Sequence, residues 1–108
     1  MTASPTHVTL VAATVATVTL DGVWPWVRVK NLIASAAQPV YFTVGSTLNP
    51  PADPTVAGNG TFACGADIAD EEMAPVPEQT TPVVVKLISG GTPTVSVRGF
   101  DRYSVTAD

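Results

Sequence analysis

The stretch PVVVKLISGGTPTVSVR, residues 82–98, decides the fold class. Residues 83–88 are apolar on both faces of an extended chain except at Lys86, which is typical of a strand buried between two layers. Gly90-Gly91 is a hairpin turn signal, and residues 94–98 then alternate between apolar and polar side chains. The stretch therefore predicts two strands joined by a tight turn, the first of them in the core.

Similar patterns recur along the rest of the chain. Val27 and Val29 alternate with Arg28 and Lys30, which predicts a strand over residues 27–33 with one buried and one solvated face. We expect this strand to form a hairpin with a strand over residues 40–44. Further strands are expected over residues 7–11, 14–20, 61–66 and 103–107.

The composition agrees with a β-rich protein, because valine and threonine together supply 32 of the 108 residues and leucine only 5. A chain of this length forms one domain, residues 1–108. About 7–8 short strands separated by glycine and proline predict an all-β fold, an antiparallel β-sandwich or a jelly-roll-like barrel.

Two segments interrupt the strands. Residues 45–60 are rich in proline and glycine and predict a long loop that proline keeps ordered. Residues 67–78 form an acidic connection in which a short helical turn over residues 70–73 is one possibility.

Charge and cysteine content exclude several classes of partner. A net charge of −4 with five basic residues argues against nucleic acid, which needs clustered Lys and Arg. Residues 31–85 hold six acidic and no basic side chains, so the remainder has a surplus of positive charge. We expect no export signal, no membrane segment and, with Cys64 as the only cysteine, synthesis and folding in a reducing cytoplasm.

No arrangement of residues indicates an enzyme or a cofactor site. His7 is interpreted as a solvated residue at the start of a strand, and Cys64 as a small buried side chain rather than a reactive thiol. The acidic group Asp67, Asp70, Glu71 and Glu72 is interpreted as a solvated loop, because its spacing matches no calcium-binding loop, although its oxygen ligands would suit calcium.

Aromatic residues are the candidate contacts. Trp24 and Trp26 flank Pro25, and strand alternation would place both on one face, opposite Val27 and Val29. They are interpreted as an interface anchor or a sugar-stacking platform, the alternative being a small core under the 45–60 loop. Phe100 and Tyr103 lie near Arg98 and Arg102 and form a second candidate contact, with ordinary strand packing as the alternative.

The strand patterns at residues 14–20, 27–29, 40–44 and 84–97 resemble small β-rich structural proteins of tailed bacteriophages that infect actinobacteria. This resemblance covers about half of the chain and carries strand patterns rather than chemical signatures. It implies a virion component, on the capsid exterior, that decorates the major capsid protein and forms a homo-oligomer, with a trimer favoured.

The sequence thus supports two hypotheses of different classes. The first is a non-enzymatic capsid decoration subunit that binds the major capsid protein. The alternative is a carbohydrate-binding or host-adhesion module in a fibre or tail. Capsid co-sedimentation would favour the first, and a change of tryptophan fluorescence with polysaccharide would favour the second.

Overall fold

A computed structural model describes residues 6–35, 38–58 and 61–101. These ranges contain eight β-strands and no helix. They therefore include no helical segment that could span a membrane. In chain order the strands are β1 Thr6–Thr9, β2 Ala16–Thr19, β3 Trp26–Ile33, β4 Val40–Ser46, β5 Phe62–Cys64, β6 Glu71–Pro75, β7 Val83–Ser89 and β8 Thr94–Phe100.

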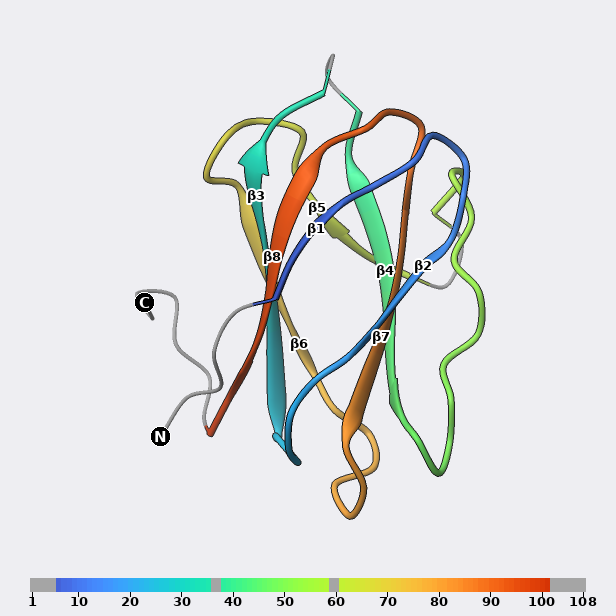
Figure 1. Cartoon of the computed structure of the whole chain (residues 1–108), viewed down its shortest axis with the longest axis vertical. Helices are drawn as coiled ribbons and strands as arrows, with labels where there is room; N and C mark the ends of the chain where they lie inside the picture. Colours follow the sequence, from blue (N-terminus) through green and yellow to red (C-terminus); the bar gives the residue numbers. More distant parts are fainter. Residues whose placement is uncertain (1–5, 36–37, 59–60, 102–108) are drawn as a thin grey trace.

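The strands form two antiparallel sheets packed face to face as a β-sandwich (Figure 1). The first sheet has the order β1-β8-β3-β6, and the second has the order β2-β7-β4-β5. Figure 1 looks onto the edge of the sandwich where β1 and β2 lie, with β5 and β6 behind. The prediction of an all-β sandwich of short strands is confirmed.

Both predicted hairpins are wrong. β7 and β8 belong to different sheets, and so do β3 and β4. The Gly90-Gly91 turn therefore connects the two sheets. The physical reason is that a glycine turn reverses the chain equally well within a sheet or between two sheets. Whether the strand after the turn joins the same sheet or the other sheet depends on which neighbouring strand lets it bury more apolar surface.

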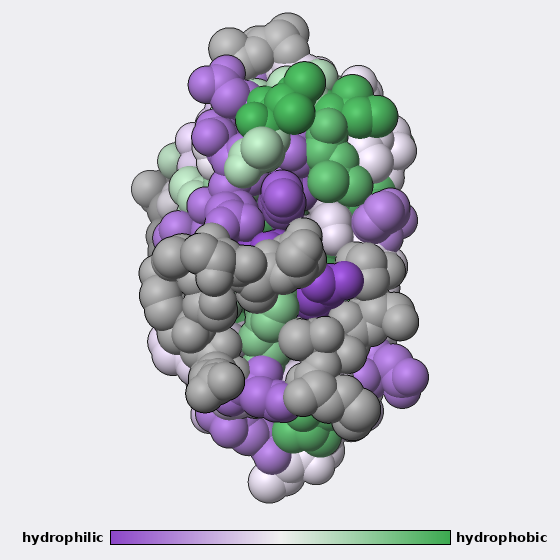
Figure 2. Space-filling view, turned by 90° about the vertical axis from the view of Figure 1, so that its left-hand side faces the viewer, coloured by the Kyte–Doolittle hydropathy of each residue, from purple (hydrophilic) through white to green (hydrophobic). Residues whose placement is uncertain are grey.

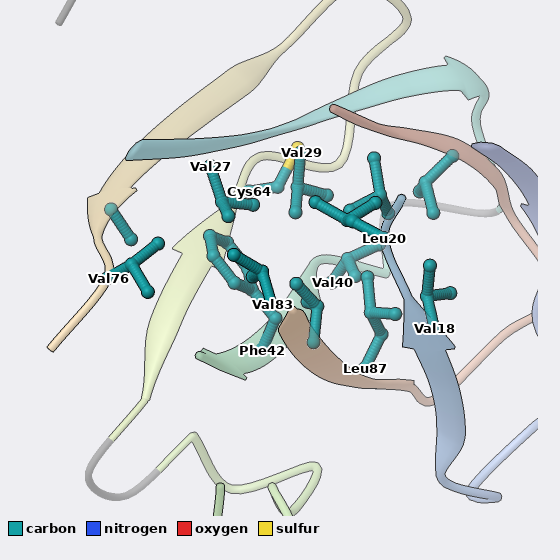
Figure 3. Close-up of a cluster of buried hydrophobic side chains, with 14 of the residues drawn as sticks. Val18, Leu20, Val27, Val29, Val40, Phe42, Cys64, Val76, Val83 and Leu87 are labelled. Carbon is teal, nitrogen blue, oxygen red and sulfur yellow. The ribbon is translucent and has the colours of Figure 1, made fainter. Parts of the chain in front are cut away.

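The core lies between the sheets and consists of the inward side chains of each strand (Figure 3). Val27 and Val29 of β3 and Val95 and Val97 of β8 are fully buried in the first sheet. The second sheet contributes Val18, Val40, Phe42, Val83, Val85 and Leu87, and Leu20 and Val76 fill the space beside the strands. This period-two burial is the pattern that the sequence predicts for half-buried strands.

β7 is buried on both faces, as its sequence predicts. Val84 and Ile88 lie on the face opposite the core, yet each is only 6% exposed. The segment after β4 packs on this outer face, where the Thr43 hydroxyl donates to the Ala52 carbonyl (2.6 Å) and Lys86 Nζ lies 2.9 Å from Asp53 Oδ1. We call residues 47–58 the covering loop.

The predicted helical turn over residues 70–73 is also wrong, because this segment opens β6, which pairs with β3. The pairing continues before β6, where Asn31 N donates to Asp70 O and Ala69 N donates to Asn31 O, both at 2.8 Å. A neighbouring strand thus satisfies backbone groups that a helical turn would have satisfied internally. The strand predicted over residues 103–107 lies outside the described residues.

Candidate interaction surface

Trp24 lies in the core rather than on the surface. Its side chain is 6% exposed and belongs to the main hydrophobic cluster, not to a separate core under the covering loop. The indole Nε1 donates to the Asp21 carbonyl at 3.0 Å, and the ring lies against the backbone of Gly99 in β8. The buried polar end of the ring therefore has its hydrogen bond.

Trp26 is placed differently. It opens β3, directly before the core residue Val27, so strand alternation puts its half-buried side chain on the outer face of the first sheet. Its cross-strand neighbours are Phe100 of β8 and Pro75 of β6. The two tryptophans therefore do not form an exposed pair.

Phe100 is buried under two arginines on this outer face. It is 3% exposed, and the guanidinium carbons of Arg28 and Arg98 lie 5.2 and 5.9 Å from its ring centroid. A buried ring leaves little surface for a partner, so Phe100 contributes to packing in the isolated subunit. Tyr103 lies outside the described residues, and the interface role of all four aromatic residues stays a prediction.

The environment of Arg28 differs more than that of any other candidate residue from the environment that the sequence predicts. The alternation of residues 27–30 predicts a solvated side chain, but Arg28 is 2% exposed and forms an ion pair with Glu71 (3.4 Å). Burial lowers the pKa of Arg28, Glu71 opposes this shift, and the neighbouring Arg98 adds to it. The sequence could not show this, because Glu71 reaches Arg28 only through the β3–β6 pairing.

Cys64 and His7 are the two residues that the sequence analysis considered for catalysis. Cys64 is fully buried and its Sγ donates to the Asp70 carbonyl at 3.1 Å. Burial raises the pKa of the Cys64 thiol to about 12, helped by the nearby acids of residues 70–72, so the thiolate is absent at neutral pH. His7 is exposed in β1, as expected.

Asp67 and Asp70 of the acidic group are joined by a local hydrogen bond. The Asp70 carboxylate accepts a hydrogen bond from Asp67 N at 3.0 Å, and Asn31 Nδ2 donates to Gly65 O at 3.2 Å. Across residues 6–35, 38–58 and 61–101, no group of three or more His, Cys, Asp or Glu side chains is arranged to hold a metal ion. Asp67 and Asp70 thus help to fix the turn between β5 and β6, whereas Glu71 and Glu72 lie half-buried in β6 and not in the solvated loop that the sequence predicts.

An apolar patch that the sequence does not reveal lies beside this turn. Ile33 and Ile68 are 61% and 68% exposed, and the bonds between Asn31 and residues 69–70 bring their segments together. Figure 2 shows apolar side chains gathered at the upper end of the molecule, where β3 ends and the β5–β6 turn lies in Figure 1. We call this pair the Ile33/Ile68 patch.

Comparisons with known proteins identify no family. No family model matches the chain, and no curated protein matches it. Among solved structures, the chain is similar to the SPBc2 prophage-derived protein YomS, with a TM-score of 0.46 and 11% sequence identity. The similarity covers 92% of this chain and 94% of YomS.

Proposed function

We propose that this protein is a non-enzymatic structural subunit of a tailed phage particle, a capsid decoration protein that binds the major capsid protein. The resemblance of its strand patterns gives the class of assembly. The observation that carries the proposal is the Ile33/Ile68 patch at one end of the sandwich. Exposed aliphatic side chains at this end support a docking role for it.

The patch has the features of a small protein-binding surface. Two large aliphatic side chains on neighbouring segments each have more than half of their surface in water, where burial by a partner releases free energy. The adjacent Asp67 and Asp70 form a polar rim, as interfaces commonly have. A contact of this size is weak for one subunit, so an oligomer that engages several capsid sites at once would gain occupancy through avidity.

The surface composition favours a packed location. Only 13% of residues are charged, compared with about 25% in an average soluble protein, so close packing against neighbours removes few charges from water. The carbohydrate-binding alternative would need the two tryptophans exposed side by side as a stacking platform. Instead, Trp24 is buried in the core and Trp26 is half-buried on the outer face of the first sheet.

Co-sedimentation with purified phage heads tests the proposal. The double variant Ile33→Ser with Ile68→Ser should bind at least about tenfold more weakly, because each buried isoleucine contributes ~1.5 kcal/mol or more. Its thermal midpoint should stay close to that of the original protein, because both side chains are exposed.

The matched control changes Leu48 and Val56 to serine, which removes exposed aliphatic side chains of the covering loop. This control should bind heads like the original protein. Equal binding by the Ile33/Ile68 variant, or equal loss by the control, would refute a docking role for the patch.

A further inference from the structure

We infer that the free edge of β2 is a self-association site, at which β2 of a second copy of this chain adds as an antiparallel strand. This inference goes beyond the proposed function and does not depend on it. It rests on the hydrogen-bonding groups of the edge, on the absence of charge along it and on its self-complementary register.

The outward backbone groups of β2 belong to Thr17 and Thr19. Leu20 N donates to Val83 O at 2.8 Å, and alternation along an antiparallel pair then directs the groups of Val18 and Ala16 toward β7 as well. The amide and carbonyl groups of Thr17 and Thr19 therefore point away from β7. Within the described ranges no segment pairs with this side of β2.

The edges on the opposite side of the sandwich are protected against strand addition. Pro75 in β6 has no N–H to donate, and Glu71 and Glu72 put negative charge on the same strand. β5 is only three residues long. β1 begins at the first described residue. Of the edge strands whose two flanks are described, β2 and β5 carry neither a charge nor a proline, and β2 is the longer of the two.

The register explains why the occupant is a second copy. With a two-fold axis at Val18, Thr17 lies opposite Thr19 of the partner subunit, so the outward groups of both strands meet and bond in pairs. Asp21, the nearest charged residue along the chain, then falls opposite Val15 of the partner subunit. No like charges meet, although the chain carries a net charge of −4.

A four-residue strand offers few hydrogen bonds, so we expect weak, concentration-dependent association. In sedimentation equilibrium the average mass should rise from 11.1 kDa toward twice that value as concentration increases. Over the same range, hydrogen exchange at the Thr17 and Thr19 amides should slow, whereas the Val18 amide, already bonded to β7, should not change.

Charge variants provide the specific test. One protein carries Thr17→Lys and Thr19→Lys, and the other carries Thr17→Glu and Thr19→Glu, at positions whose side chains are exposed. Each protein alone should stay monomeric, because like charges face each other across the two-fold axis. An equimolar mixture should form a heterodimer, because every Lys then faces a Glu.

The control pair places the same charges at Thr55 and Thr92, two exposed loop positions, and should associate like the original protein. The inference fails if the original protein remains monomeric at all concentrations. It also fails if the edge variants associate as the original does, whether as dimers or as trimers, or if the mixture does not pair. Capsid co-sedimentation of the Ile33/Ile68 variant is independent of each of these results.

Discussion

At the scale of single residues, the Trp24 ring leaves room only for glycine at position 99. A Cβ added to Gly99 would lie 2.3 Å from Trp24 Cγ and 2.5 Å from Cδ1, far inside van der Waals contact. The indole is held in place by its hydrogen bond to Asp21 O, so it cannot move freely. A residue without a side chain is therefore required where β8 passes under Trp24.

Gly99→Ala should lower the free energy of unfolding by about 1–3 kcal/mol, because the added methyl group overpacks the core. Urea denaturation followed by tryptophan fluorescence measures this change. Gly90→Ala is the control, since the nearest atoms to its Cβ would belong to the exposed Gln38 side chain, which can move aside. Equal losses in the two variants would show that Trp24 does not restrict Gly99.

The Cys64 thiol predicts a pH dependence of stability. Burial raises its pKa from 9.0 to about 12, so between these values the unfolded chain loses the proton and the folded chain keeps it. The free energy of unfolding should therefore fall as pH rises through this window, by at most ~1.4 kcal/mol per pH unit. Well below pH 9.0, where the thiol keeps its proton in both states, it should contribute no pH dependence.

Urea midpoints measured from about pH 8 to about pH 10.5 test this prediction. Cys64→Ala should be less stable throughout but should lack the part of the slope that the thiol supplies. Identical slopes in the two proteins would mean that the thiol ionises in the folded state as easily as in the unfolded chain.

At the scale of elements, local pattern predicted the strands better than it predicted their partners. β7 and β8 were predicted because apolar runs and alternation are local properties. The β7–β8 connection was mistaken for a hairpin because partner choice depends on the whole core. β6 was missed because Pro75 and two acids make it a poor strand by composition, and its pairing with β3 stabilises it.

The candidate surface was less predictable than the fold, for a related reason. Ile33 ends a strand whose inner face is apolar, and nothing local shows that its own side chain lies in water. Its neighbour Ile68 is 35 positions away and arrives through the turn bonded to Asn31. Likewise, the sequence identified Trp24 and Phe100 as aromatic candidates but could not show that Gly99, Arg28 and Arg98 surround them.

The covering loop is the element that makes β7 a strand buried on both faces. A Cβ on Gly45 would lie 2.6 Å from Asn49 O and 2.8 Å from Pro51 N, so Gly45→Ala should lift the loop from the sheet. We expect faster proteolytic cleavage within residues 47–58. We also expect faster hydrogen exchange at Val84, whose cross-strand neighbour is Gly45.

The control for this prediction is Gly91→Ala, whose Cβ would meet the Ser35 side chain rather than backbone. It should leave cleavage of the covering loop unchanged. Unchanged cleavage in Gly45→Ala as well would mean that the loop is held elsewhere, for example by the Lys86–Asp53 pair alone.

At the scale of the whole molecule, the fold separates two surfaces. The sandwich measures 36 × 28 × 19 Å, with the β1 and β2 edge on one side and the β5 and β6 edge on the other (Figure 1). The Ile33/Ile68 patch lies at the end of β3 beside the β5–β6 turn, away from the free edge of β2. A subunit could therefore bind a capsid through one surface and a second copy through the other.

If this protein decorates a capsid, it should bind saturably to heads assembled from the major capsid protein alone. We predict that the protein sediments with these heads and saturates at a fixed number of copies per capsid subunit, with occupancy reduced in the Ile33/Ile68 variant. A protein that stays in the supernatant at every concentration, while its tryptophan fluorescence changes with host polysaccharide, would contradict the claim.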